Sequence, residues 1–452
     1  MWIYRSNTML QVGFSRIDIT PPFGNDISGY FVRRIADGIL DPLYVNTIAV
    51  TSGDDTIILM ATDYIGIRME YTDKIREAIS QRVGVPLDHI LVAALHQHTA
   101  PRLSADTAQT RLRDTNFIDV VIRKLVDSAQ MAMDDRRDAA MSTALTEVSE
   151  PISFVRRYFT EDDIVKSNPN TDKYSIVKRC AESDNSVRIV RFAREGANDI
   201  ALVNFSTHPD VIGGTKWSAD WPGFTRRFVE ADLENVSCIF FTGTQGDSNH
   251  IDFFKPKDER IKGGKGYEHS RYMGRTVADA VVAAWDKTVP MADESIFAEH
   301  TVVYNLTNTE GIEYYNDAVA LDKEYSEKAT AGNWSSSLFP KHPYIQSIAH
   351  CRRILSLRTS PIYRPVPITV MGIGKVALVG FGGEAFTSYS KLLKEAAPDK
   401  FMLTAVCANG YEGYFPTAEA FAQGGYEAIS SLYTPELEQQ ILTASKEMLS
   451  KF

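Results

Sequence analysis

The sequence predicts an α/β fold, with a mixed β-sheet core and helices on its outer faces. Short apolar segments that are typical of buried strands alternate with longer segments of helical periodicity, as in strand–helix–strand units. Several of the apolar segments also end abruptly in polar residues, and ligands of open α/β sheets bind at such strand ends. We therefore expect a site where the carboxyl ends of several strands converge.

The elements of the amino-terminal half follow from this pattern. A broken apolar alternation predicts a strand that ends at Pro21 and Pro22, and a polar turn between two apolar runs predicts a hairpin. Helical spacing that stops before Gly84 and Pro86 predicts a helix followed by a strand. The predicted segments are strand 10–19, hairpin 44–50 and 56–60, helix 69–83, strand 90–95, helix 117–137 and strand 141–148.

The carboxyl-terminal half repeats the alternation of strands and helices. Pro222 suits the first turn of a helix, with Asp220 as its N-cap, and Gly372 and Gly374 lie near the turn of a strand pair. The predicted segments are strands 187–192 and 200–205, helix 220–233, strand 236–241, helix 267–287, paired strands across 368–379, a helix ending at 397 and strand 402–408. Residues 310–358 are charged and helix-rich, which predicts an insertion or lid over a site.

Composition limits the function classes. The chain has 452 residues, of which 44% are hydrophobic, so it can bury a large core. A net charge of -10 without a long basic run argues against nucleic acid or an anionic membrane as partner. The four cysteines form no Cys-x-x-Cys pair. We therefore expect a small-molecule substrate, and the sequence predicts no oligomeric state.

Neither a membrane segment nor an export signal is evident. No apolar run reaches about 18 residues, and the amino terminus lacks the apolar core of a signal peptide. These features predict a cytoplasmic protein, with a start at Met9 or an export signal missing from this sequence as alternatives. Although the length suggests two or three domains as a rough prior, no Pro/Gly/Ser-rich linker divides the chain. We expect one domain over residues 1–452.

The most informative strand end is Asp88–Pro101, with the sequence DHILVAALHQHTAP. A buried strand here delivers His96 and His98, which would share one face if the extended backbone continued through them. Both side chains could then bind a single ion or contact a single carbonyl group. The His-x-His spacing suits zinc, but a pair of rim histidines without a ligand is the competing interpretation.

Other strand ends supply further candidates. His208 follows the strand at 200–205, and Glu384 follows the strand pair at 368–379. Two histidines and a carboxylate are an ordinary catalytic zinc set, in which the metal lowers the pKa of a bound water to about 7 and generates a hydroxide nucleophile. This set predicts hydrolysis. A Ser-His-Asp arrangement with Ser248 and Asp247 is the alternative, but the Gly-x-Ser-x-Gly elbow is absent.

Ordered motifs across most of the chain resemble the neutral/alkaline, non-lysosomal ceramidase family and its bacterial relatives. The motifs are SRIDITPP, LHQHTAP, NFSTHPD, SADWPGF, TQGDSNH, GGEAF, and NGYEGY followed by GGYEA. The resemblance implies zinc ligation by His96, His208, Glu384 and Tyr414, a choice among the tyrosines that the strand-end reasoning left open. It also implies a zinc-dependent amide hydrolase and membership of lipid metabolism.

The resemblance also implies roles for residues around the metal. His98 and Arg156 would orient the substrate carbonyl, and Tyr426 would help to stabilise the oxyanion. The sequence departs from the family at GDSNH, where the family's active-site serine falls on Asn249 or, with a shift of one residue, on Ser248. Arg157 is a rival for the role of Arg156, and both arginines are surface residues on the plainest interpretation.

Three function hypotheses follow. The first is a zinc-dependent hydrolase, resembling a catalytic domain without the family's immunoglobulin-like appendage, that attacks a linear amide of an N-acyl substrate smaller and more polar than ceramide. The second is a zinc hydrolase of an ester, a lactone or a sugar-derived compound. The third is a non-catalytic ligand-binding module. In each case the segment from Trp334 to Tyr344 would shape the pocket.

Overall fold

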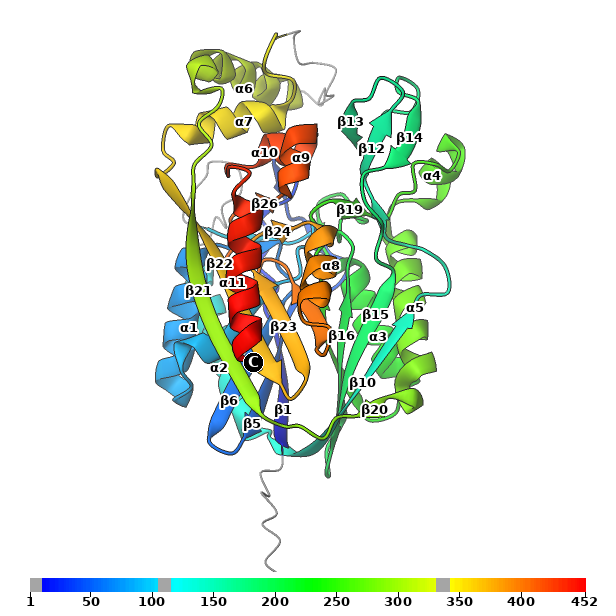
Figure 1. The fold of residues 1–452 in the computed structure, drawn as a ribbon, viewed down its shortest axis with the longest axis vertical. Coiled ribbons are helices and arrows are strands. Elements are labelled where there is room, and N and C mark those ends of the chain that lie inside the picture. Colours follow the sequence, from blue (N-terminus) through cyan, green and yellow to red (C-terminus); the bar gives the residue numbers. More distant parts are fainter. Residues whose placement is uncertain (1–9, 105–114, 331–341) are drawn as a thin grey trace, which may run out of the picture.

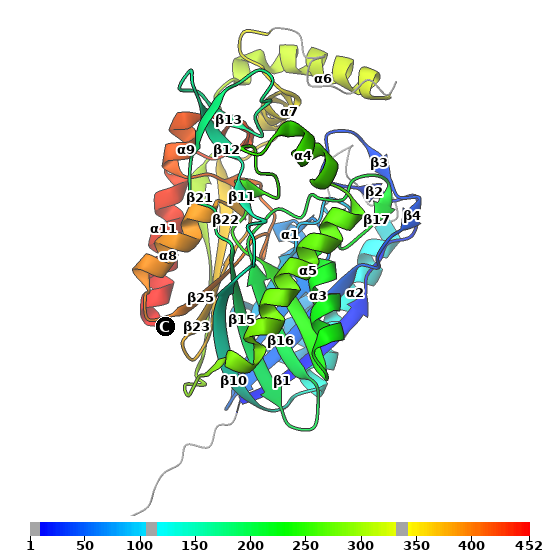
Figure 2. The same ribbon diagram turned by 90° about the vertical axis from the view of Figure 1, so that its right-hand side faces the viewer.

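Two β-sheets packed face to face form the centre of the molecule (Figures 1 and 2). The computed structural model describes residues 10–104, 115–330 and 342–452. The larger sheet contains, in spatial order, β18 (Val236–Thr242), β16 (Asp199–Phe205), β15 (Ser186–Arg194), β10 (Arg137–Glu147), β1 (Leu10–Asp18), β5 (Tyr44–Ser52), β6 (Asp55–Thr62) and β8 (Ile90–Ala94), with β20 (Val289–Pro290) paired to β10. The smaller sheet contains β21 (Ile296–Leu306), β22 (Tyr363–Ile373), β23 (Val376–Phe381) and β25 (Phe401–Ala405).

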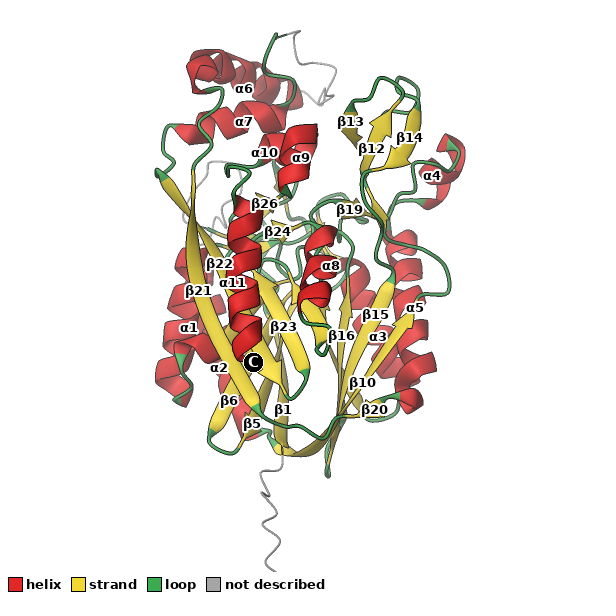
Figure 3. Cartoon of the chain, viewed as in Figure 1, coloured by secondary structure: helices red, strands yellow, loops and turns green. Residues whose placement is uncertain are grey.

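Helices cover the outer face of each sheet, which confirms the predicted α/β class with helices outside (Figure 3). The helices on the larger sheet are α1 (Met69–Val83), α2 (Thr115–Asp134), α3 (Asp220–Asp232) and α5 (Tyr267–Ala284). The helices on the smaller sheet are α8 (Thr387–Ala396) and α11 (Leu437–Lys451). No described helix is both long enough and apolar enough to span a bilayer.

Strand direction places several carboxyl ends at one edge. β6 and β8 run parallel, as do β16 and β18, and β23 and β25 in the smaller sheet. The other neighbours pair antiparallel, including the hairpin of β5 and β6, in which Ser52 lies opposite Asp55. Parallel pairs end on the same side of a sheet, so the residues that follow β8, β16 and β23 meet.

Apolar side chains from both sheets fill the space between them. Ile57 and Leu59 of the larger sheet meet Leu378 and Leu403 of the smaller one. Polar contacts join the sheets near the strand ends, where the buried Asn204 side chain donates to the carbonyl oxygens of Phe241 (2.7 Å) and Thr404 (2.9 Å).

Short strand pairs lie next to the edge where the strands converge. They are β24 (Glu384–Ala385) with β26 (Tyr414–Phe415), β11 (Phe154–Val155) with β19 (Ser248–Asn249), and β7 (Gly66–Ile67) with β9 (Arg102–Leu103). The remaining elements are β2 (Asp26–Ile27), β3 (Arg34–Ile35), β4 (Gly38–Ile39), β12 (Arg157–Thr160), β13 (Val165–Ser167), β14 (Ile176–Arg179), β17 (Lys216–Trp217), α4 (Lys257–Gly263), α9 (Ala418–Gln423), α10 (Tyr426–Ser430) and the 3-10 turns η1 (Leu87–His89), η2 (Trp285–Lys287) and η3 (Ile312–Tyr314).

The 310–358 segment is helical on both sides of the residues that the structure leaves undescribed. α6 (Tyr315–Thr330) and α7 (Ile348–Leu357) share a small apolar core that includes Ala318, Ile345 and Ile354. They lie beyond α10, at the end of the molecule where the strand ends converge (Figure 1). Trp334 belongs to residues 331–341, which lie outside the described part, so the expected pocket role of Trp334–Tyr344 stays a prediction.

One condition stated for the histidine pair is not met, and one local expectation was wrong. The strand at 90–95 does not continue in extended form through the histidines: β8 ends at Ala94, and His96 has a φ of 76°. Asp220 is not the N-cap of α3, because it lies within the helix bounds and Ala219 precedes it. Its buried carboxylate instead accepts N–H groups from Val211 (3.0 Å) and Trp221 (2.7 Å), fixing the loop that follows β16.

Candidate metal centre

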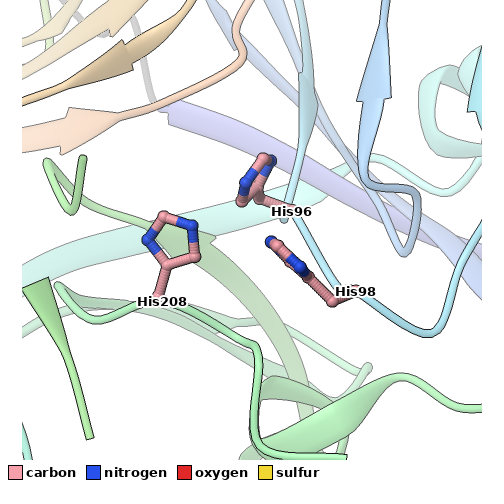
Figure 4. Close-up of side chains that lie close together, drawn as sticks. All are labelled: His96, His98 and His208. Carbon is pink, nitrogen blue, oxygen red and sulfur yellow. The ribbon is translucent and has the colours of Figure 1, made fainter. Parts of the chain in front are cut away.

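Three buried histidines converge at the edge where β8 and β16 end (Figure 4). His96 and His98 follow β8, and His208 follows β16. The ring centroids are 4.9 Å apart for His96 and His208, 5.1 Å for His96 and His98, and 5.3 Å for His98 and His208. One nitrogen of each ring lies within 4.8 Å of the others, so the cluster could hold a metal ion.

A left-handed residue brings the first two histidines together. An extended backbone would have placed His96 and His98 on one face by alternation. Instead, the positive φ of His96 turns the chain directly after the strand, while its backbone N–H remains bonded to the Tyr64 carbonyl oxygen at 2.9 Å. Left-handed residues other than glycine are uncommon and cluster at functional sites.

Backbone carbonyls orient two of the imidazoles. Nδ1 of His96 lies 2.7 Å from the Ile65 carbonyl oxygen, and Nδ1 of His208 lies 3.1 Å from that of Gln245. Each Nδ1 therefore carries a proton and donates it, which makes Nε2 the ring atom that can bind a metal in the neutral tautomer. This tautomer is the one that a metal-binding histidine needs when Nε2 is the ligand atom.

Both Nε2 atoms face the carboxylate of Glu384. Oε2 of Glu384 lies 3.3 Å from Nε2 of His96 and 3.4 Å from Nε2 of His208. Oε1 accepts a hydrogen bond from the Tyr411 hydroxyl at 3.2 Å, whereas Oε2 is buried without a hydrogen-bond partner. Burial opposes ionisation of Glu384, but His96 and Arg156 outweigh it and lower the pKa of the carboxyl to about 2.

The electrostatics keep two of the imidazoles neutral. Burial, followed by the neighbouring His96, lowers the pKa of His98 well below its ordinary value. Burial and then Arg156 do the same for His208. Neutral imidazole is the metal-binding form. His98 differs from the other two because neither of its ring nitrogens has a hydrogen-bond partner, with Asp210 Oδ1 at 3.6 Å from Nδ1.

The donor set fits a zinc ion on its chemistry. Two oriented Nε2 atoms and an unpartnered carboxylate oxygen meet in a buried place, which is the set expected for a catalytic site. His98 could replace Glu384 as the third donor, since its ring belongs to the same cluster. Both candidate sets contain His96 and His208.

Arg156 contacts two tyrosines beside the histidine cluster. The Arg156 guanidinium donates to Glu427 Oε1 at 2.7 Å and to the Tyr414 hydroxyl at 3.1 Å, and it lies 5.9 Å from the Tyr426 ring centroid. Burial lowers the pKa of Arg156, but Tyr414 and Glu427 outweigh it and raise it overall. Burial raises the pKa of Tyr426 to about 12. Arg156 is therefore a permanent cation at this site, and Tyr426 a neutral hydroxyl.

Tyr414 reaches the centre through the β24–β26 pair. Its Cα is the ladder partner of the Glu384 Cα, so both residues leave neighbouring strands at the same level. Tyr411, in the loop before β26, bonds Glu384 directly through its hydroxyl. Burial and Glu384 raise the pKa of both phenols well above the ordinary value. Each is neutral unless a cation binds nearby.

Other predicted residues lie away from the centre. Ser248 Oγ donates to the Gln245 carbonyl at 3.2 Å, and Asn249 Nδ2 donates to Asn168 at 2.6 Å. Neither residue lines the cavity beside the histidines, and the hydrogen bonds of the described residues show no serine–histidine pair at Ser248. Arg157 contacts Gln423 of α9, so of the two arginines Arg156 is the one beside the cluster.

A cavity of about 240 Å³ opens onto the cluster. Its lining includes His96, His98, Glu384, Tyr411, Tyr414 and Tyr426, together with Tyr30, Phe31, Arg102 and Arg352. Sequence reasoning did not single out Glu427 and Asp210, although both stand inside motifs it used, GGYEA and NFSTHPD. The signal that could have identified both is a charged residue close to a candidate site residue within the same motif. Arg102 carries no such signal, apart from directly following the LHQHTAP motif.

No protein-family model and no curated protein matches this sequence. Among solved structures, the chain is similar to the neutral ceramidase from Pseudomonas aeruginosa, with a TM-score of 0.67, 14% sequence identity, and coverage of 98% of this chain and 74% of that chain. It is also similar to a ceramidase complexed with C2, with a TM-score of 0.66, 14% identity, and coverage of 98% and 75%. The comparison confirms the resemblance inferred from the sequence motifs at the level of the fold: the chain has the fold of the neutral ceramidase structures.

Proposed function

We propose that this protein is a zinc-dependent hydrolase that cleaves the amide bond of a small N-acyl substrate. One observation carries the proposal: the Nε2 atoms of His96 and His208 converge on an unpartnered oxygen of Glu384 in the wall of a cavity. The shared fold with ceramidase structures supports a hydrolase.

His96, His208 and Glu384 would hold the zinc, with Tyr414 as a fourth ligand from the strand beside Glu384. When bound, zinc polarises an acyl carbonyl and lowers the pKa of a water molecule to about 7, so that a nucleophile is available near neutral pH. The carbonyl oxygens of Ile65 and Gln245 keep the two imidazoles in the tautomer that binding requires.

Other residues would act on the substrate. Arg156 presents a cation that Glu427 holds in place, and Tyr426 presents a neutral hydroxyl from the same side. Both are suited to stabilise negative charge that develops on the carbonyl oxygen. His98 is neutral and has no hydrogen-bond partner, so it can bind the substrate carbonyl or carry a proton to the leaving amine.

The cavity volume bears on the substrate. About 240 Å³ lies below the roughly 300 to 1,000 Å³ of typical ligand sites, which favours a compact molecule over a lipid with two long chains. An N-acyl compound with a short acyl group is the first choice. Esters, lactones and sugar-derived compounds of similar size use the same chemistry and belong in the same substrate panel.

Metal analysis tests the proposal. Purified protein is expected to contain about one zinc ion per chain, to lose amide hydrolysis on chelation and to recover it when zinc is returned. His96→Ala should lower the zinc content and lower kcat by at least about 1,000-fold. Ser248→Ala is the matched control and should retain both zinc and activity.

Two results would count against the proposal. Zinc-free protein with unchanged hydrolysis, together with inactivation by Ser248→Ala, would favour a serine hydrolase. Protein that binds a ligand with the same affinity before and after His96→Ala, and hydrolyses nothing in the panel, would be a binding module.

A further inference from the structure

Arg102 is a cation in the wall of the catalytic cavity without a counter-charge among the residues that the structure describes. Its Nε is buried without a hydrogen-bond partner. Two other arginines differ in this respect: Arg352, which also lines the cavity, and Arg156, which lies behind it against Tyr414. Arg352 donates to Asp322 at 2.9 Å, and Arg156 donates to Glu427 at 2.7 Å. Arg102 therefore contributes positive charge to the cavity that no described carboxylate neutralises.

The position of Arg102 is fixed at both ends. Its backbone belongs to β9, which pairs in parallel with β7, and the carbonyl of the preceding Pro101 accepts the N–H of Ile65 at 3.1 Å. Its guanidinium lies 4.8 Å from the centroid of the Tyr411 ring. Tyr411 in turn packs against Gly66, where a Cβ would lie 2.3 Å from the ring, and bonds Glu384 through its hydroxyl.

These contacts resemble a built anion site more than a solvated surface charge. Stacking on an aromatic face holds the plane of a guanidinium while leaving its N–H groups free. A planar N–H fork matches a carboxylate, which it can bind through two parallel hydrogen bonds. Tyr411 contacts both Arg102 and Glu384, so a single tyrosine ring separates the guanidinium from the proposed metal ligand.

We propose that Arg102 binds a carboxylate of the substrate, and that the enzyme therefore hydrolyses anionic amides such as N-acyl amino acids. This inference rests on the proposed function, because it names the substrate class of the same site. Hydrolysis consumes one water: its oxygen joins the acyl carbon, the C–N bond breaks, and the nitrogen takes a proton. An N-acyl amino acid would give a carboxylate and a free amino acid.

Matched substrate pairs test the proposal. Each N-hexanoyl amino acid in a panel is compared with its carboxamide, which has nearly the same shape without the charge. The zinc-loaded enzyme should prefer the acid by about 10- to 100-fold in kcat/KM for the best amino acid. Arg102→Met should remove most of this preference by slowing the acid and not the carboxamide, and Arg102→Lys should restore part of it.

Further substrates locate the carboxylate within the substrate, and a second arginine variant controls for the overall positive charge of the cavity. N-succinyl amines carry the carboxylate on the acyl side, so a preference for them over neutral N-acyl amines, lost in Arg102→Met, places the anion there. Arg352→Met removes a cavity arginine that is already paired and should keep the preference for acids. Equal turnover of acids and neutral amides by the wild-type enzyme, or an equal effect of Arg102→Met on both, would overturn the inference.

A binding measurement separates this inference from the proposed hydrolase. Calorimetry on chelator-treated protein with N-hexanoyl amino acids and their carboxamides reports anion recognition without turnover and without a metal that could bind the carboxylate. Acid-selective binding that is lost in Arg102→Met would support Arg102 even if no amide were hydrolysed. Hydrolysis of neutral amides alone, without acid-selective binding, would keep the hydrolase and overturn the carboxylate site.

Discussion

At the scale of single residues, the two tyrosines beside Glu384 pose the sharpest question. Tyr411 bonds the carboxylate directly, whereas Tyr414 stands on the neighbouring strand and accepts from Arg156. A phenolate ligand needs positive charge to offset burial, and Tyr414 has Arg156 in contact. Tyr411 also has a cation, Arg102, against its ring face, but its hydroxyl already donates to the carboxylate and so supports Glu384.

We predict different effects for the two phenylalanine variants. Tyr414→Phe would remove the proposed fourth metal ligand and should weaken zinc affinity by more than about 100-fold. Tyr411→Phe would remove only a hydrogen bond to Glu384, a proposed ligand, and should weaken zinc affinity by about 10-fold. Competition with a zinc-sensitive dye measures both constants. The opposite order would assign the ligand role to Tyr411.

Glu427 gives a second prediction at this scale. It is fully buried and paired with Arg156 at 2.7 Å and Arg157 at 3.6 Å. Glu427→Ala leaves two buried guanidinium groups without their carboxylate and should lower the free energy of unfolding by about 3 to 5 kcal/mol. Urea unfolding measures the loss.

Glu427→Gln keeps the shape of the side chain and one hydrogen-bond acceptor. It therefore separates the positioning of Arg156 from the stability of the protein. It should cost less stability than Glu427→Ala while still lowering kcat, because Arg156 is no longer held by a charge. Zinc content should stay unchanged in this variant. Loss of zinc in Glu427→Gln would show that Glu427 supports the metal ligands and not Arg156.

At the scale of elements, α3 and α5 pack unusually closely. A Cβ at Gly274 of α5 would lie 2.3 Å from the Phe224 Cβ and 2.8 Å from the Trp221 carbonyl oxygen. α3 follows the loop that carries His208, so the contact between α3 and α5 also supports the position of that loop. Glycine inside a helix normally costs about 1 kcal/mol relative to alanine, but here it permits the close approach.

Gly274→Ala should therefore destabilise the protein, against its helix propensity, by about 1 to 3 kcal/mol. Chemical unfolding checks the value. Arg271→Ala on the exposed side of α5 is the control and should change stability by less than about 0.5 kcal/mol. A stabilised Gly274→Ala variant would mean that the two helices can move apart without cost.

The limits of sequence-based prediction are clearest at this scale. Period-2 and helical patterns located β1, the β5–β6 hairpin, α1 and β8, because these signals are local. The division into two sheets was not predictable, since nothing near β25 says that it pairs with β23 and not with β18. Similarly, strand ends identified His96, His208 and Glu384, but the left-handed turn at His96 and the position of Arg102 depend on distant carbonyls and rings.

At the scale of the whole molecule, buried neutral histidines shape the acid stability. Burial lowers the pKa of His250 to about 3, with a further contribution from His269, and lowers that of His350 to about 4. The unfolded chain binds a proton at each near pH 6.5. Between pH 6.5 and these lower values the unfolded state holds more protons, so stability falls as the pH falls and is independent of these groups above pH 6.5.

We therefore predict that His250→Gln flattens the dependence of unfolding free energy on pH between 6.5 and 5. The slope should fall by up to one proton, which chemical unfolding at pH 7.5, 6.5, 5.8 and 5.0 measures. The variant and the wild-type protein should show the same, shallow dependence between pH 6.5 and 7.5. Equal slopes below pH 6.5 would show that His250 is protonated in the folded state.

Contacts between the sheets determine whether the molecule unfolds as one unit. Asn204 of the larger sheet bonds Thr404 of the smaller one, and Asn409, which follows β25, accepts the N–H of Val92 at 2.9 Å. Apolar residues of both sheets also belong to one continuous core. Neither sheet can separate without exposing that core and these buried polar groups. We expect a single cooperative transition in calorimetry, with equal calorimetric and van't Hoff enthalpies.

Asn204→Leu tests how the two sheets are coupled. The variant leaves the Phe241 and Thr404 carbonyls without their buried donor, so it should lower stability by about 1 to 3 kcal/mol per unsatisfied group while keeping one transition. Limited proteolysis of the zinc-loaded wild-type protein should cleave first within the 310–358 segment and leave both sheets in a folded product. Two calorimetric transitions, or two independently folded fragments containing one sheet each, would instead divide the chain into separate domains.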